Sequence, residues 1–306
     1  MAPLTTFRVQ FRSMGSHNEV VVAAHDAESA QTALDKAVAE VQRIEQKYSR
    51  YRQDSVLSRI NAHAGAPSFF PCDSETQQLL EIADLLYRQS SGLFDITSGI
   101  LRRAWDFKQK TLPTPRHIAE LLPKIGWPKI KLTTQGVELP EAGMEIDLGG
   151  IAKEYAADCA ADCLRQQGLS HGYVNLGGDI AVIGPQADGS PWRIGIRHPR
   201  TPGKLMASIP LMQGALATSG DYERFFEHNG QRYCHILNPQ TGYPCSHWQS
   251  VSVVAPRCMV AGATATIAML HEQQGQAFLQ ATRHPYLAVN PHGHLISNTS
   301  PSQGTS

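Results

Sequence analysis

Two pairs of glycines, each placed directly after an extended apolar segment, are the part of the sequence best suited to chemistry. At the first pair, residues 144–148 alternate apolar and polar side chains, which predicts a half-buried strand, and Gly149 and Gly150 follow at once. Apolar residues spaced by four then predict a helix over residues 151–164. Such a junction lets a polar ligand approach bare backbone, and the N–H groups and dipole at the helix start favour a phosphate.

Charged residues flank this first junction. Lys153 adds a full positive charge in the first turn of the expected helix, as a phosphate or pyrophosphate requires, and Asp147 stands where it can meet a ribose, a base edge or a metal. A glycine pair at a strand end is also ordinary turn chemistry, so one junction does not decide between the two interpretations. A second junction, an expected strand over residues 172–176 closed by residues 177–179 (Gly-Gly-Asp), lies close by in the sequence. Two such backbone approaches predict one shared ligand cleft.

The surrounding elements are mixed rather than strictly alternating. Strands are expected over residues 7–12 and 19–24, followed by a long amphipathic helix over residues 27–50. Later segments predict further strands and a helix of small residues over 258–270. This order predicts an α+β fold with a mixed sheet in a single domain over residues 1–296, and the polar residues 297–306 are expected to be a disordered tail.

The composition excludes several classes of function. The chain has 306 residues, 42% of them hydrophobic and 18% charged, and its 27 Lys and Arg balance 27 Asp and Glu. No net field therefore attracts nucleic acid or an anionic membrane. No apolar run is long enough to span a membrane, and the N-terminus shows neither a signal peptide nor a lipid-attachment cysteine, which predicts a cytoplasmic protein. The six cysteines form no CxxC pair, and Cys159 and Cys163 are interpreted as core thiols rather than metal ligands.

Several segments together resemble the ApbE family of FAD:protein FMN transferases. They follow the family's order over roughly residues 7–290, and the most specific are the segments 147–153 (DLGGIAK) and 235–244 (HILNPQTGYP). The other segments are residues 14–16 (MGS), 48–51 (YSRY), 54–55 (DS), 92–97 (GLFDIT), 175–179 (NLGGD), 218–222 (TSGDY) and the alanine-rich stretch that ends at Thr266.

The resemblance implies a fold and an activity. The fold would be T-fold-like, with mainly antiparallel sheets and flanking helices. Such a protein would bind FAD and Mg²⁺ and transfer FMN from FAD to a Ser or Thr hydroxyl of a target flavoprotein, releasing AMP. Two alternatives are an FAD-binding carrier or sensor without catalysis, and an FAD pyrophosphatase that yields free FMN and AMP.

The resemblance also implies which residues form the site. His235 is the candidate for proton handling at the acceptor hydroxyl, with a structural hydrogen bond as the alternative role. The implied FAD contacts are Met14, Tyr51, Leu93, Phe94, Asp95, Asp147, Lys153 and Ile236.

At the implied metal site the sequence departs from the family. A backbone carbonyl at Gly150 and the hydroxyl of Thr266 match the family's Mg²⁺ ligands, but the usual aspartate falls on Gly262. Mg²⁺ usually takes one or two carboxylates, so this loss predicts a weakened site unless Asp95, Asp147 or Asp179 compensates.

Overall fold

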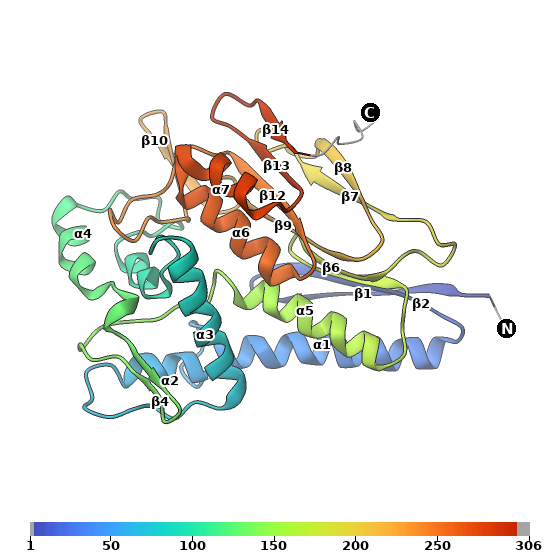
Figure 1. Ribbon diagram of the computed structural model, residues 1–306, viewed down its shortest axis with the longest axis horizontal. Coiled ribbons are helices and arrows are strands. Elements are labelled where there is room, and N and C mark those ends of the chain that lie inside the picture. The colour runs from blue at the N-terminus through green and yellow to red at the C-terminus, as the bar shows by residue number, and fades with distance from the viewer. Residues whose placement is uncertain (1–2, 299–306) are drawn as a thin grey trace.

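The computed structural model describes residues 3–298, and its centre is one antiparallel sheet of eight strands (Figure 1). In spatial order these strands are β1 (Thr5–Ser13), β2 (Ser16–Ala24), β5 (Gly172–Leu176), β6 (Asp179–Gly184), β9 (Gly214–Gly220), β12 (Ser250–Ala255), β13 (Tyr286–Val289) and β14 (Leu295–Ser297). All neighbouring pairs are antiparallel. With the helices below, this confirms the α+β expectation.

Three helices pack against one face of this sheet and form the main core with it. They are α1 (Ala27–Tyr48), α5 (Ala152–Gln166) and α6 (Cys258–Leu270) (Figure 1). Helix α1 contacts β2 and α5, α5 contacts β6, and α6 contacts β9 and β12. Helix α6 is apolar on nearly every side because it contacts both the sheet and α5.

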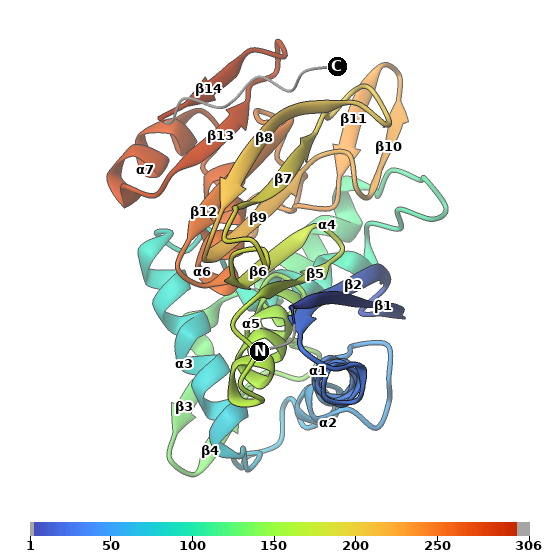
Figure 2. The same cartoon turned by 90° about the vertical axis from the view of Figure 1, so that its right-hand side faces the viewer.

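A hairpin covers part of the other face. Strands β7 (Trp192–Arg197) and β8 (Leu205–Leu211) pair with each other and lie over the sheet (Figure 2). Their buried side chains, Ile194, Ile196, Ala207 and Leu211, form a second core with buried residues of β6, β9 and β13. The sheet is therefore buried on both faces near its centre, which explains why β6 is buried along its whole length.

The remaining elements surround this centre. They are α2 (Val56–Ala62), α3 (Ser74–Gln89), α4 (Pro115–Leu121), α7 (Gly275–Thr282), the hairpins β3 (Lys131–Thr133) with β4 (Gly136–Glu138) and β10 (Phe225–His228) with β11 (Gln231–Cys234), and 3-10 helices at Ile96–Arg103, Leu122–Lys124, Trp127–Lys129 and Glu272–Gln274.

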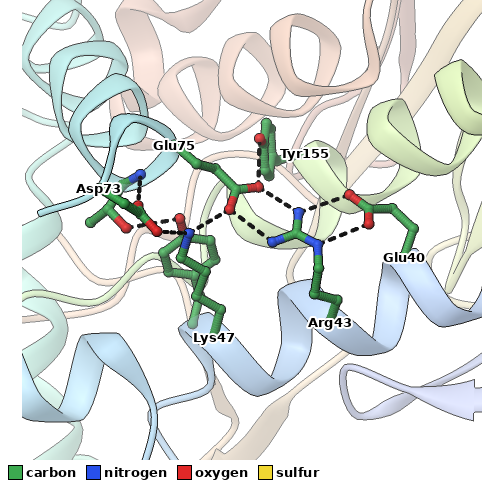
Figure 3. Close-up of polar contacts among 8 residues, drawn as sticks. Glu40, Arg43, Lys47, Asp73, Glu75 and Tyr155 are labelled. Atoms are coloured by element: carbon green, nitrogen blue, oxygen red, sulfur yellow. Dashed lines mark hydrogen bonds and ion pairs between the residues drawn. The ribbon is translucent and has the colours of Figure 1, made fainter.

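A polar network ties α1, α3 and α5 together (Figure 3). The Glu75 carboxylate of α3 accepts hydrogen bonds from Arg43 (2.6 and 2.8 Å) and Lys47 (2.6 Å) of α1, and from the Tyr155 hydroxyl of α5 (2.9 Å). Direct hydrogen bonding by Arg43, assisted by Lys47 and Tyr155, lowers the pKa of Glu75 to about 2. The network fixes the end of α1 from which residues 49–55 continue toward the site.

One local prediction is wrong in its detail. Residues 144–148 are extended and alternate as expected, with Met144, Ile146 and Leu148 buried, but they join no sheet. Instead the side-chain amide of Asn61 donates to the carbonyl of Ile146 (2.9 Å) and accepts from its N–H (2.8 Å). One side chain thus replaces the partner strand, and sequence periodicity cannot tell these two partners apart.

A second difference concerns residues 100–107, for which the sequence pattern predicts a helix. The chain forms a 3-10 helix over Ile96–Arg103 instead, capped at its start by the carboxylate of Asp95.

Three further expectations concern the ends and the location of the chain. Ser297 ends β14, and residues 299–306 of the predicted tail lie outside the described residues. Within residues 3–298, no helix has the length and hydropathy that crossing a membrane requires. The single domain and the cytoplasmic location stay predictions.

Candidate active site

The first glycine junction is fixed by Asp147. Its N–H donates to the carbonyl of Ile96 (2.8 Å), one carboxylate oxygen accepts from the N–H of Gly149 (2.9 Å), and the other accepts from the Arg50 guanidinium. This approach requires a glycine at position 99, where a Cβ would lie 2.2 Å from the Cβ of Asp147. The Asp147 carboxylate therefore holds the turn and orients a cation.

The second glycine junction lies beside the first, as expected. The Nζ atom of Lys153, at the start of α5, pairs with the carboxylate of Asp179 at 2.6 Å and lies 3.7 Å from where a Cβ on Gly177 would stand. Burial alone lowers the pKa of Lys153, but the negative charge of Asp179 outweighs this and raises it above its usual range. Lys153 is therefore a permanent cation between two bare stretches of backbone.

Further cations gather here from other segments. A guanidinium nitrogen of Arg197 on β7 lies 3.4 Å from the ideal Cβ position of Gly178. A guanidinium nitrogen of Arg224, just before β10, lies at the same distance from the ideal Cβ position of Gly15. With Arg50 and Lys153, four separate segments bring positive charge to the glycine-lined backbone, an arrangement that suits a polyanionic ligand such as a pyrophosphate.

Two side chains implied to contact the flavin, those of Tyr51 and Met14, lie beside this group of cations. Tyr51 is 77% exposed, and the Arg50 guanidinium lies 5.0 Å from its ring centroid and donates to its hydroxyl (2.9 Å). Met14 has a positive φ of 54° in the turn between β1 and β2, and its N–H donates to Glu45 of α1 (2.6 Å). A ring held on one side by a guanidinium, with its surface open, can stack on a flat ligand.

The loop of Leu93, Phe94 and Asp95 meets the first junction. The Phe94 ring is buried and lies 3.2 Å from where a Cβ on Gly150 would stand, whereas Leu93 is half-buried. One carboxylate oxygen of Asp95 accepts from the N–H (2.8 Å) and hydroxyl (2.6 Å) of Thr97, and the other from the N–H of Trp127 (3.0 Å). The Asp95 carboxylate is thus already occupied by protein donors.

His235 and Ile236 follow β11. The backbone N–H of His235 donates to the carbonyl of Arg224 (3.0 Å), and residue His235 is exposed to solvent. The protein atoms that surround the ring, and then the positive charge of Arg224, lower the pKa of His235 below its usual value of 6.5. Water still reaches the ring, which limits this shift. Ile236 is only 8% exposed and packs in the core.

The implied metal ligands lie where α5 and α6 meet the sheet. The Thr266 hydroxyl is 2.7 Å from that of Ser219 on β9. A Cβ at Gly262, one turn earlier on α6, would lie 2.6 Å from Cγ of Glu154, a buried residue of α5. Across residues 3–298, no group of three or more His, Cys, Asp or Glu side chains is placed to hold a metal ion.

Two surface hollows lie outside this set of residues. One of about 430 Å³ is lined by residues of β1, β2 and β5. Another of about 310 Å³ lies beside Asp221 and its partner Arg200. Neither contains Lys153 or a residue of the two glycine pairs, so we place the candidate site by its converging cations and bare backbone.

Sequence reasoning assigned no role to Glu154, Arg197 or Arg224. Nothing in the sequence indicates that Glu154 is buried, because a glutamate in the first turn of a helix is usually solvated. The available signal was Gly262: a glycine inside a helix rich in alanine and threonine indicates that something approaches it closely.

Comparison with known proteins agrees with this geometry. The model of the ApbE family matches residues 14–289. An FAD:protein FMN transferase of Vibrio cholerae is 34% identical over 274 residues, which cover 86% of this chain and 80% of the relative. An FAD:protein FMN transferase of Treponema pallidum is 33% identical over 265 residues, covering 80% of this chain and 73% of the relative.

Solved structures extend the likeness to the fold. The ApbE protein of Thermotoga maritima superposes with a TM-score of 0.88 at 30% identity, covering 96% of this chain and 97% of that chain. The flavin transferase ApbE of Vibrio cholerae gives a TM-score of 0.83 at 27% identity, with 98% of both chains covered. The ApbE-like fold expected from the sequence is thereby confirmed. The family match spans most of the chain and both glycine junctions, and the chain belongs to the ApbE family.

Proposed function

We propose that this protein is an FAD:protein FMN transferase, which moves FMN from FAD to a Ser or Thr hydroxyl of a target flavoprotein and releases AMP. The observation that carries the proposal is the pair of glycine junctions bridged by Lys153 and Asp179, in a chain that belongs to the ApbE family. Relatives at 34% and 33% identity bear the name of this activity.

The reaction is a phosphoryl-type transfer. The acceptor hydroxyl oxygen forms a bond to the phosphorus on the FMN side of the pyrophosphate, the bond to the AMP oxygen breaks, and the hydroxyl proton passes to a base. Catalysis of this kind rests mainly on positioning and on neutralising phosphate charge. Lys153 and Arg50 are assigned to the phosphates, while Tyr51 and Met14 are assigned to the flavin ring. The roles of Leu93, Phe94, Asp147 and Ile236 as FAD contacts, and of Asp95 through its backbone, belong to the same proposal.

His235 is proposed to receive the hydroxyl proton. Its lowered pKa keeps the imidazole neutral near pH 7, and a neutral ring is the form that accepts a proton. The competing structural role gains no support from its ring, since the hydrogen bond that holds His235 within the described residues comes from its backbone N–H.

Mg²⁺ is proposed as the cofactor, with the carbonyl of Gly150 and the hydroxyl of Thr266 among its ligands. Both are oxygen donors of the kind that this ion prefers, and the buried Glu154 carboxylate beside Gly262 supplies the negative charge that such a site needs. When bound, Mg²⁺ supplies charge neutralisation at the pyrophosphate.

One experiment separates the three candidate activities. The protein is incubated with FAD, Mg²⁺ and an acceptor flavoprotein that carries a flavinylation Ser or Thr, with the Ser/Thr→Ala acceptor as the matched control. We expect AMP release in equal amount to flavin fluorescence that stays on the denatured acceptor, and neither signal with the control acceptor. AMP with only free FMN would indicate the pyrophosphatase, and tight FAD binding without AMP would indicate a carrier or sensor.

A further inference from the structure

Among the described carboxylates near the implied metal position, Glu154 is the one with a buried oxygen that accepts no hydrogen bond. It is 8% exposed, and its Oε2 atom has no hydrogen-bond partner among the residues that the structure describes. The three carboxylates considered from sequence are occupied: Asp95 by Thr97 and Trp127, Asp147 by Arg50 and Gly149, and Asp179 by Lys153. A buried carboxylate with an unsatisfied oxygen is costly unless something else compensates it.

The register between α5 and α6 explains where this carboxylate lies. Both carboxylate oxygens of Asp158 accept from the first N–H groups of α6, those of Cys258 (2.8 Å) and Met259 (3.0 Å). One turn back along α5, Glu154 lies against Gly262, which is one turn forward along α6. The two helices are therefore antiparallel here, so the start of α5 lies toward the end of α6 that carries Thr266.

Gly262 leaves the space that the Glu154 side chain fills. Its ideal Cβ position is 2.6 Å from Cγ and 2.7 Å from Oε1 of Glu154, so any side chain at position 262 would overlap the glutamate. The carboxylate missing from α6 and the carboxylate added on α5 would thus occupy the same space between the two helices.

Near Glu154 the carboxylates outnumber the cations. Glu154 and Asp179 face one Lys153, while Asp158, on the same helix, is held by the α6 N–H groups and lies 3.5 Å from Arg257. A divalent cation beside Glu154 would supply the further positive charge.

We propose that Glu154 provides the carboxylate ligand for a divalent cation in this protein, in place of the side chain absent at Gly262. The inference rests on the proposed function for the identity of the ion, Mg²⁺, and on the contacts of Glu154 for the ligand. In this proposal the carboxylate ligand has moved from α6 to the facing helix α5, and the metal site is retained.

The test measures Mn²⁺ binding by the electron paramagnetic resonance of the free ion, without FAD and then with FAD, in the wild-type chain and in three variants. Glu154→Gln keeps the shape of the side chain and removes its charge. Asp162→Asn is the matched control, because it removes one negative charge from a half-buried position two turns further along α5, where Arg165 and Arg257 pair with it. E154G/G262D moves the carboxylate from α5 to α6.

We expect Glu154→Gln to weaken Mn²⁺ affinity at least tenfold, Asp162→Asn to change it less than twofold, and the double variant to bind within about threefold of the wild type. Equal Mn²⁺ titrations for Glu154→Gln and the wild type would overturn the assignment of the ligand. A folded E154G/G262D variant, judged by circular dichroism, that does not bind Mn²⁺ would overturn the proposed move of the carboxylate from α6 to α5.

A separate FAD titration in EDTA keeps this test distinct from that of the proposed function. A wild-type chain that binds no FAD even after excess Mg²⁺ is added would refute the transferase proposal, while the Mn²⁺ titrations without FAD would still decide the role of Glu154.

Discussion

The contact between Glu154 and Gly262 makes a prediction about stability that does not depend on any ligand. In Gly262→Ala, the new methyl group would lie 2.6 Å from Cγ of Glu154, a carbon that is not the free end of a flexible chain. Overpacking of this kind costs about 1–3 kcal/mol. Replacing glycine by alanine inside a helix favours folding by about 1 kcal/mol. From the closeness of the contact we place the clash in the upper part of its range, so Gly262→Ala should lower the free energy of unfolding by about 1–2 kcal/mol.

The sign should reverse when the glutamate is removed. In an E154A background the methyl group meets open space, so only the helix preference remains and Gly262→Ala should raise the free energy of unfolding by about 0.5–1 kcal/mol. The coupling between the two positions is then about 2 kcal/mol, well above the 0.3–0.5 kcal/mol scatter seen for independent sites.

Urea denaturation at pH 7 in EDTA, followed by circular dichroism, measures these four chains. As a control, Asp162→Ala should leave the effect of Gly262→Ala unchanged within about 0.5 kcal/mol, because Asp162 is further along α5. The same cost for Gly262→Ala with and without Glu154 would show that the two residues do not touch in solution, and the reasoning about the α5–α6 register would fail with it.

Three more predictions concern charged groups. Lys153→Ala should weaken FAD binding about 10- to 100-fold in a fluorescence titration and leave riboflavin unchanged, since the lost contact is to phosphate; equal losses for both ligands would exclude that role. His235→Ala should lower kcat about 100-fold or more and leave the Kd for FAD within about threefold, and a large loss of affinity would reassign His235 to binding. Glu75→Gln should destabilise the protein at pH 7 by about 1–2 kcal/mol after discounting for solvent exposure. Hydrogen bonds from Arg43 lower the folded pKa of Glu75 from 4.5 to about 2, so its contribution is complete above pH 4.5 and is lost as the pH falls through 2. The stability difference should therefore vanish below pH 2, and a difference that persists there would contradict the network as its source.

Patterns formed by neighbouring residues were readable without the structure. The expected strands over residues 7–12 and 19–24 are β1 and β2, and the expected helix over residues 27–50 is α1, with Asp26 as its N-cap. The two glycine junctions were found because a strand end, a glycine pair and a charged residue are adjacent in the chain. The sequence also determined the family, because the motifs of the site are short and keep their order.

Only the tertiary structure decided which carboxylates are available. The sequence alone does not distinguish the carboxylates of Asp95, Asp147, Asp179 and Glu154. In the described structure the three aspartates are held by protein donors, whereas Glu154 is buried with an oxygen that has no hydrogen-bond partner. That difference arises from contacts between residues about a hundred positions apart, such as Asp158 with Cys258, which set how α5 meets α6. Periodicity, capping and turn chemistry are local properties, whereas burial and helix register depend on how distant segments pack together.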